Sequence, residues 1–356
     1  MPCQTVVKND NDVNSSHLIS TTTLSMAHPV LNGWIILDKP LGLGSTQGVG
    51  AVKRALREGG YPRVKVGHGG TLDPLATGVL PIAVGEATKL AGRMLDASKI
   101  YEFTIGFGAQ TDTLDLEGSV IATSDVRPTM AAIEAVLPRF TGPVAQVPPA
   151  FSALKLDGKR AYDLARAGEE VELEPRSVTV HCLVPLPFRG EVRRGGCQPV
   201  PPLGIERSDS PLSQPSPLKG RGLSAITLTA HVSKGTYIRS LARDIALALG
   251  TVGHVTMLRR IKAGPFVIAQ AISLDILFEK SKARRLEDIT LPIRTALDDI
   301  PALALTPEQA ELLHHGQVLT GIDAPDGLTL ALNGDVPLAL VEVSGGNVRS
   351  VRRFNL

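Results

Sequence analysis

Apolar and polar positions alternate in short runs separated by glycine and proline, and these runs predict short strands and helices in mixed order. Residues 33–40 (GWIILDKP) are typical of a buried strand that ends in a turn. A helix is expected next, because apolar residues recur every three or four positions after Ser45 and Thr46, either of which can cap it. Residues 86–98 predict a second helix.

Further along the chain, the pattern predicts three strands and another helix. In residues 99–108 (KIYEFTIGFG), Tyr101 begins the apolar face of an alternating strand. Residues 178–184 and 226–232 have the same character, and a turn and a helix are expected after the last strand. Strands and helices mix without a regular β-α-β repeat, so an α+β fold is favoured over a doubly wound parallel sheet.

Composition divides the chain into three parts. Residues 1–30 are polar and predict a disordered extension, and residues 31–298 form the main unit. Within that unit, an insertion spans 190–223; its 28 residues from 195 to 222 include five Gly and six Pro, too many for a strand. Because strands are predicted on both sides, the insertion is interpreted as an enlarged hairpin loop. Residues 299–356 predict a small β-rich domain.

Charge and cysteine content limit the classes of function. The net charge is only +2, yet residues 51–70 hold five Lys or Arg against one acidic residue, and residues 234–262 hold six against one. Both clusters flank glycine-rich turns, which favours anion binding over simply solvated faces. Three cysteines without C-x-x-C spacing indicate neither a zinc site nor a disulfide framework and fit a reducing cytosol. No apolar run approaches the ~18 residues of a membrane span.

Residues 67–81 (GHGGTLDPLATGVLP) place one carboxylate, Asp73, between a glycine-rich turn and a proline. This stretch resembles the motif G-H-x-G-T-L-D-P-x-A-x-G-V-L of the TruB family of tRNA pseudouridine synthases. Further segments resemble the family in the same order: GWIILDKPLG, GEATKL, KIYEFTIGFGAQTDTLDLEG, QVPPAFSALKLDGKRAYDLARAGEEVE, SKGTYIRSLARDIALALG and HVTMLRRIKAGPF. Together they cover residues 33 to about 270 apart from the insertion, and six ordered motifs are far more specific than one.

The resemblance implies cofactor-free isomerisation of uridine 55 in the TΨC loop of tRNA. The base would be flipped out, its glycosidic bond broken, and the ring rejoined to the sugar through C5. The implied fold is a central, mixed and mainly antiparallel sheet flanked by helices and loops, with residues 31–298 as the catalytic domain. Residues 299–356 resemble a PUA-like RNA-binding domain. The implied partner is the T arm of tRNA, and the protein is expected to be a cytoplasmic monomer without metal or membrane association.

Seven residues match family positions with a role. Asp73 matches the catalytic aspartate, Arg239 the arginine that pairs with it, and Tyr101 the tyrosine that stacks on the base. Four others match residues around the pocket: His68 lines the site of the flipped nucleotide, Lys89 buttresses the catalytic loop, and Tyr237 and Leu258 belong to the pocket wall.

The chemistry explains why a single carboxylate suffices. Asp73 would attack C1′ or remove the C2′ proton, and no second acid is needed because no water is activated, unlike glycoside hydrolysis. Arg239 would keep that carboxylate ionised. The basic clusters, through Lys53, Arg54, Arg57, Arg259 and Arg260, are expected to neutralise T-arm phosphates.

Read alone, each of these residues also has an ordinary structural explanation. An Asp-Pro pair is typical of turns, an arginine is typically exposed, and a tyrosine on a strand often belongs to the core. A non-catalytic RNA-binding protein would need the basic clusters but not Asp73 together with Tyr101 and Arg239. A serine hydrolase would need a G-x-S-x-G motif, which the chain lacks.

Overall fold

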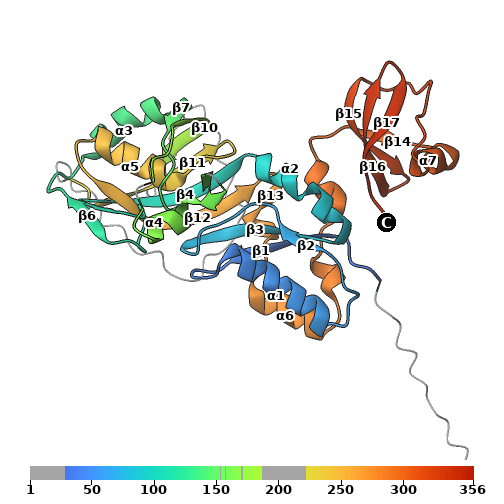
Figure 1. Cartoon of the computed structure of the whole chain (residues 1–356), viewed down its shortest axis with the longest axis horizontal. Helices are drawn as coiled ribbons and strands as arrows, with labels where there is room; N and C mark the ends of the chain where they lie inside the picture. The colour runs from blue at the N-terminus through green and yellow to red at the C-terminus, as the bar shows by residue number, and fades with distance from the viewer. Residues whose placement is uncertain (1–28, 153, 157, 170, 187–221) are drawn as a thin grey trace, which may run out of the picture.

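The computed structural model describes residues 29–152, 154–156, 158–169, 171–186 and 222–356. A mixed nine-stranded sheet forms the centre (Figure 1), and its main path runs β1-β3-β12-β4-β11-β10-β7, with β2 on β3 and β13 on β12. Within this sheet, β3 and β12 pair in parallel and the other described neighbours are antiparallel. Its strands are β1 (Gly33–Lys39), β2 (Val66–His68), β3 (Ala76–Val84), β4 (Lys99–Phe107), β7 (Gly142–Gln146), β10 (Arg176–Pro185), β11 (Ala225–Val232), β12 (Gly253–Ala263) and β13 (Phe266–Val267). The predicted α+β class with a mainly antiparallel sheet is confirmed.

Helices and short hairpins surround this sheet. The helices are α1 (Ser45–Glu58), α2 (Ala91–Asp96), α3 (Met130–Val136), α4 (Ala161–Arg166), α5 (Ile238–Ala248) and α6 (Leu274–Lys282). Two small hairpins pair β5 (Ala109–Thr111) with β6 (Val120–Thr123), and β8 (Lys155–Leu156) with β9 (Lys159–Arg160). Single 3-10 turns are η1 (Gly85–Leu90), η2 (Leu137–Phe140), η3 (Ile268–Gln270), η4 (Leu286–Ile289) and η5 (Ile293–Leu297).

Three apolar clusters hold the main unit together. One packs α5 against β4 and β11 around Phe103 and Leu228. A second packs α1 and α6 against β1 and β3 around Leu37, and these two helices lie side by side (Figure 1), joined by a 2.6 Å hydrogen bond from Ser281 Oγ to the Ala55 carbonyl. The third surrounds Trp34 on the other face of β1, since successive strand residues point to opposite faces.

Two local expectations were wrong. Helix α1 begins at Ser45 with Gly44 as its N-cap residue, which has no side chain to cap the helix; the Gln47 side chain instead accepts from the Gly44 amide at 2.7 Å. The helix expected over 86–98 is instead the 3-10 turn η1 followed by the six-residue α2. The exposed Gly92, in the middle of the expected segment and second in α2, disfavours a longer helix.

The hairpin around the proposed insertion has its described ends in place. Strands β10 and β11 pair antiparallel, from Val180 opposite Val232 to Pro185 opposite Leu228. The insertion itself lies mostly outside the described residues, as does the extension expected over 1–28. The cysteine pattern indicated no disulfide, and this is wrong at Cys182 on β10, which is disulfide-bonded.

The C-terminal part forms a separate sheet in the order β14-β15-β16-β17 (Figure 1), so the predicted β-rich domain is confirmed. Its elements are β14 (Ala302–Ala304), α7 (Pro307–His314), β15 (Gly327–Asn333), β16 (Val336–Ser344) and β17 (Asn347–Arg353). Leu330, Leu340 and Phe354 join the apolar cluster around Trp34, which ties this sheet to the main unit. No described helix is long and apolar enough to cross a membrane.

Candidate active site

The loop that carries Asp73 connects β2 to β3, and a buried lysine donates a hydrogen bond to its backbone. Lys39, at the end of β1, is fully buried and donates hydrogen bonds from Nζ to the carbonyls of Leu43 at 2.6 Å, Pro40 at 3.0 Å and Pro74 at 3.0 Å. Its three donors therefore all find acceptors. Burial lowers the pKa of Lys39 to about 8, although the charge of Asp73 opposes that shift.

Two further side chains fix the same loop. The Ser45 hydroxyl both donates to the Leu72 carbonyl and accepts from the Leu72 amide, each at 2.8 Å, so the start of α1 is bound to the residue before Asp73. Arg260, fully buried on β12, donates to the carbonyls of Gly70 at 3.0 Å, Thr71 at 3.1 Å and Val79 at 2.8 Å. The loop backbone is thus held at both ends before any substrate arrives.

One glycine makes the close approach of these strands possible. Gly78 on β3 has φ +98°, a left-handed conformation that disfavours other residues. A Cβ atom there would lie 2.2 Å from the Arg260 carbonyl oxygen on the parallel strand β12. Glycine at this position therefore lets β12 bring Arg260 against the catalytic loop.

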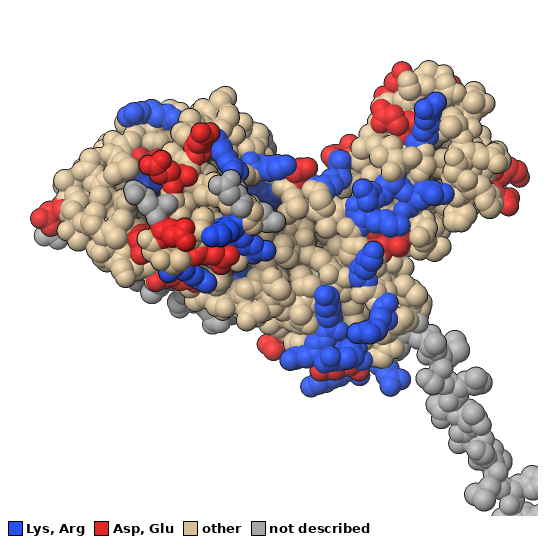
Figure 2. Space-filling model, viewed as in Figure 1, with Lys and Arg blue, Asp and Glu red and all other residues tan. Residues whose placement is uncertain are grey.

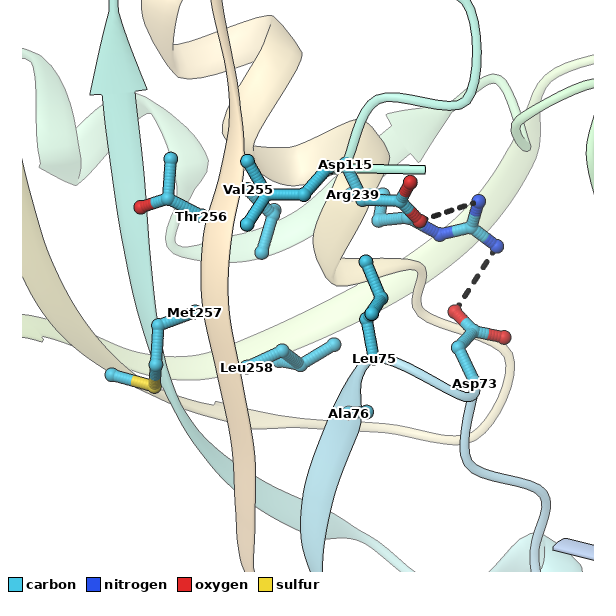
Figure 3. Close-up of a pocket in the computed structure, with 10 residues that line it drawn as sticks. Asp73, Leu75, Ala76, Asp115, Arg239, Val255, Thr256, Met257 and Leu258 are labelled. Carbon is cyan, nitrogen blue, oxygen red and sulfur yellow. Dashed lines mark ion pairs between the residues drawn. The ribbon is translucent and has the colours of Figure 1, made fainter. Parts of the chain in front are cut away.

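An arginine between two aspartates forms the polar centre of the site (Figure 3). Arg239, in the first turn of α5, lies 3.1 Å from Asp73 and 3.5 Å from Asp115, measured between nitrogen and carboxylate oxygen. The guanidinium also donates to the carbonyls of Thr113 and Phe151, both at 2.9 Å. Four acceptors from three segments therefore fix its plane. The Asp73 side chain is 42% exposed, whereas that of Asp115 is 9% exposed.

Asp115 is positioned by a strained turn after β5. Leu114 has φ +62°, a conformation that costs a bulky residue about 1–3 kcal/mol, and it is nevertheless buried. This turn presents the Thr113 carbonyl and the Asp115 carboxylate to the same guanidinium. The other carboxylate oxygen of Asp115 accepts from the Thr113 hydroxyl at 2.6 Å and from the Glu117 amide at 3.0 Å.

A pocket opens beside these charges, and its walls are mostly apolar (Figure 3). Leu258 on β12 and Leu75 after the catalytic loop lie on the side of the strand that faces the Asp73–Arg239 pair, whereas the Met257 side chain points to the other side of β12. The remaining lining residues are Ala76, Asp115, Leu116, Val255 and Thr256. As it stands the cavity is about 20 Å³, room for one water molecule, so a larger group enters only if part of the lining moves.

The structure brings some of the residues predicted from sequence to this pocket and places others nearby. Asp73, Arg239 and Leu258 line it. Tyr101, on β4, is half-buried and packs against the two apolar clusters that flank the site. Tyr237 precedes α5, and Gln146 binds its backbone twice, at 2.7 and 3.1 Å. Burial raises the pKa of Tyr237, and the charge of Asp73 adds to this effect.

His68 and Lys89 are not among the residues that line the pocket. His68, on β2, has a pKa lowered by burial and by the charge of Arg260, which favours the neutral imidazole. Lys89 instead pairs with Glu86 at 2.6 Å and donates to the Arg353 carbonyl at 2.9 Å, so it connects η1 to the C-terminal sheet. The lysine that supports the catalytic loop is Lys39.

The expected phosphate contacts are partly wrong. Arg260 is fully buried and bonded to the loop, so it cannot reach a phosphate. Arg259 is partly exposed and pairs with Asp38 at 2.8 Å. Lys53, Arg54 and Arg57 are exposed on α1, as a phosphate contact requires.

Sequence reasoning missed Lys39, Asp115 and the structural role of Arg260. Lys39 follows an apolar strand, where a lysine is expected to mark the exposed end of the strand rather than a buried anchor. The signal for Asp115 was present, because a second carboxylate in TDTLDLEG has to pair with something if it is buried. No group of three or more His, Cys, Asp or Glu residues that could hold a metal ion occurs in the described part of the chain.

Comparisons with known proteins identify the family of this chain. Residues 55–194 match the model of the TruB family pseudouridylate synthase N-terminal domain, and residues 239–298 match that of the tRNA pseudouridylate synthase B C-terminal domain. The chain is 59% identical to tRNA pseudouridine synthase B of Novosphingobium aromaticivorans over 92% of this chain and 98% of that protein. It is 52% identical to tRNA pseudouridine synthase B of Zymomonas mobilis over 91% of this chain and 96% of that protein.

Solved structures with the same fold are more distant in sequence. The archaeal box H/ACA sRNP Nop10-Cbf5 complex contains a chain that superposes with a TM-score of 0.61 at 22% identity, over 92% of this chain and 87% of that one. An H/ACA RNP bound to a substrate RNA containing 2′-deoxyuridine gives a TM-score of 0.62, also at 22% identity, over 92% of this chain and 86% of that one. At this identity the likeness concerns the fold.

Proposed function

Because this chain belongs to the TruB family and isomerises uridine in tRNA to pseudouridine, we propose that its target is uridine 55 in the TΨC loop and that Asp73 is the catalytic carboxylate. The observation that carries the proposal is the accessibility of the two carboxylates that share Arg239. Asp73 is exposed at the pocket, whereas Asp115 is buried behind the guanidinium. A substrate entering the pocket therefore meets Asp73.

The proposed reaction needs Asp73 as an anion. Its carboxylate either attacks C1′ or removes the C2′ proton, and the electron pair of the C1′–N1 bond leaves with the uracil. The uracil turns within the pocket, C5 bonds to C1′, and Asp73 either leaves C1′ or returns the proton to C2′. C5 then loses its proton to solvent while N1 gains one, so the product is an isomer of the substrate and no leaving group departs. No water has to be activated as a nucleophile, so Asp115 remains free to orient Arg239.

Access to C1′ is proposed to require base flipping. A nucleotide stacked in a folded RNA loop cannot bring its sugar to a carboxylate within a pocket, and enzymes that act on bases take them out of the stack. Leu258 and Leu75 offer an apolar surface for the flipped uracil. Tyr101 is proposed to stack on it, and Tyr237 and His68 to line the path, each from a neighbouring position.

The proposal extends to the organisation of the protein. We assign residues 31–298 to catalysis and residues 299–356 to a PUA-like RNA-binding role, which the exposed Arg349 and Arg352 on β17 support. The T arm is the proposed binding partner, the protein is proposed to act as a monomer, and the cytoplasm, where tRNA is present, is its proposed location.

Tritium release tests the assignment directly. Transcribed tRNA labelled at C5 of uridine is incubated with the purified protein, and pseudouridine is then mapped by position. We expect one tritium released per tRNA and a single modified site at position 55. Release from another position would refute the target, and release by Asp73→Asn at the rate of the unaltered protein would refute the role of Asp73.

A further inference from the structure

Lysines and arginines gather on one surface over α1 and α6 (Figure 2). The surface combines the exposed side of α1 with the segments that follow α1 and α6. We call it the α1–α6 basic surface and define it by its exposed members: Lys53, Arg57, Arg63, Lys282 and Arg284. The hydrogen bond between Ser281 and Ala55 holds the two contributing segments together at the C-terminal ends of the helices.

These five cations are not neutralised by neighbouring carboxylates. Glu58 pairs with Arg54 at 3.6 Å, and Asp288 pairs with both Lys280 and Arg285. Glu287 accepts from the Tyr61 hydroxyl at 2.6 Å. Within the described part of the chain, the five members of the surface form no ion pair, so their charge faces solvent.

Helix electrostatics explain only part of this arrangement. Cations near a helix C-terminus are stabilised by the macrodipole, which accounts for Arg57 on α1 and Lys282 on α6. Lys53 lies in the middle of α1, and Arg63 and Arg284 lie beyond the helices, so the dipole does not account for them. An anionic partner molecule would interact favourably with all five cations.

A glycine on the same exposed side of α1 points to the form of that partner. Gly50 lies mid-helix, where glycine destabilises, and an added Cβ would meet no atom within 4 Å. Gly48 differs, since a Cβ there would lie 3.0 Å from the Leu80 side chain. Packing within the chain therefore explains Gly48 but not Gly50. A glycine on an exposed helix face leaves room for the backbone of another molecule to approach closely.

The exposed side of α1 also connects to the catalytic loop. The helix starts at Ser45, which is bonded to Leu72, and Gly50 and then Lys53 and Arg57 follow on successive turns. At 1.5 Å per residue, the 14 residues of α1 extend about 20 Å from the loop. We propose that the α1–α6 basic surface, with Gly50 at its inner end, binds the sugar-phosphate backbone of the RNA whose uridine occupies the pocket. This inference rests on the proposed function for the identity of the RNA.

The proposed contacts between these cations and RNA phosphates are tested by the salt dependence of binding. Lys53→Ala/Arg57→Ala/Arg284→Ala is compared with the unaltered protein by filter binding at several salt concentrations, using both full-length tRNA and an isolated T-arm stem-loop. Each lost phosphate contact lowers the slope of log affinity against log salt by about 1, so we expect a slope lower by about 2 to 3. A loss with both RNAs assigns the surface to the T arm, and a loss confined to full-length tRNA assigns it to the rest of the molecule.

The proposed close approach of the RNA backbone to Gly50 is tested with a substitution that does not change the charge. Gly50→Gln introduces a good helix former that blocks close approach, and Gly92→Gln, on the exposed side of α2, is the matched control. We expect Gly50→Gln to raise the melting temperature and to weaken RNA binding by about tenfold with little change in salt slope, whereas Gly92→Gln keeps its affinity within about twofold.

An unchanged slope in the triple variant, together with unchanged affinity in Gly50→Gln, would overturn the inference for both RNAs. The proposed function is judged separately, from pseudouridine formation by the unaltered protein. If that protein binds RNA through this surface but modifies another site, the target assignment fails while the binding surface stands.

Discussion

Asp115→Asn tests whether the buried aspartate governs the catalytic one. The amide has the same shape as the carboxylate, but one of its two ends is now a donor. If its oxygen keeps the bonds from the Thr113 hydroxyl and the Glu117 amide, its NH2 faces the guanidinium of Arg239, donor against donor. If the amide flips, the NH2 faces the Glu117 amide instead. Either orientation leaves a mismatched donor in a buried site.

The magnitude follows from the same contacts. One buried polar group without a partner costs about 1–3 kcal/mol, so we expect the free energy of unfolding to fall by about 2 kcal/mol. Arg239 keeps its bonds to two carbonyls and to Asp73, but it loses the second carboxylate, whose attraction holds the guanidinium on the side opposite Asp73. A displacement of the reacting group by about 1 Å can cost about 100-fold in rate, so we expect the rate of the chemical step to fall between about 10- and 100-fold.

The assay separates chemistry from binding. Single-turnover tritium release from C5-labelled tRNA reports the chemical step, filter binding reports affinity, and thermal unfolding reports stability. Asp112→Asn is the matched control, because Asp112 is exposed in the same turn and accepts from the amides of Thr113 and Ser119 without contacting Arg239. If Asp115→Asn loses stability but keeps the single-turnover rate of the unaltered protein, Asp115 only supports the turn and the reasoning is wrong.

Four other outcomes are expected. Asp73→Asn should bind tRNA normally and release no detectable tritium, since the amide lacks the anionic oxygen that both routes need. Arg239→Lys should keep tRNA affinity but lower the single-turnover rate about 10- to 100-fold, because an ammonium cannot reproduce the planar fork; an unchanged rate would contradict this. The rate of the unaltered protein should fall as the pH rises through about 8, where Lys39 loses a proton that it donates to the loop carbonyls; a flat profile to about pH 9 would exclude this role. Replacing residues 195–221 by a short Gly/Ser turn should leave activity within about threefold, measured by the same assay, because β10 and β11 already pair as neighbours.

The fold was predictable where a strand buries one face only, because its apolar residues then alternate with polar ones along the sequence. Strands β4 and β11 alternate buried and less buried residues because one face of the sheet meets α5, and their sequences show that alternation directly. Segment 86–98 was less predictable, since its apolar spacing fits a helix while Gly92 breaks the propensity. Ser45 failed as a predicted cap because its hydroxyl is used by Leu72, a contact between residues 27 positions apart.

The site was predictable from sequence only as far as motifs extend. Asp73 and Arg239 were paired in advance by family resemblance, and the 3.1 Å distance between them agrees with that pairing. The structural roles of Lys39 and Arg260 were not found, because no local pattern distinguishes a lysine or arginine that binds buried carbonyls from one that faces solvent. Three-dimensional contacts decide that difference, and here they exclude Arg260 from the RNA-binding role that its basic neighbours suggested.

The two kinds of cation in this site have separate effects on the carboxylate. Lys39 and Arg260 donate only to backbone carbonyls, which belong to the catalytic loop, the turn after β1 and strand β3, so they set where the backbone of Asp73 lies without contacting its side chain. Among the described residues, Arg239 alone forms an ion pair with the carboxylate, and it is itself held by Asp115 and two carbonyls. Because a rigid loop and a fixed guanidinium are both in place before binding, little reorganisation remains for the reaction step. Asp73 can therefore stay exposed to the incoming nucleotide and still be oriented. Both properties are needed because this one carboxylate carries the chemistry without a second acid.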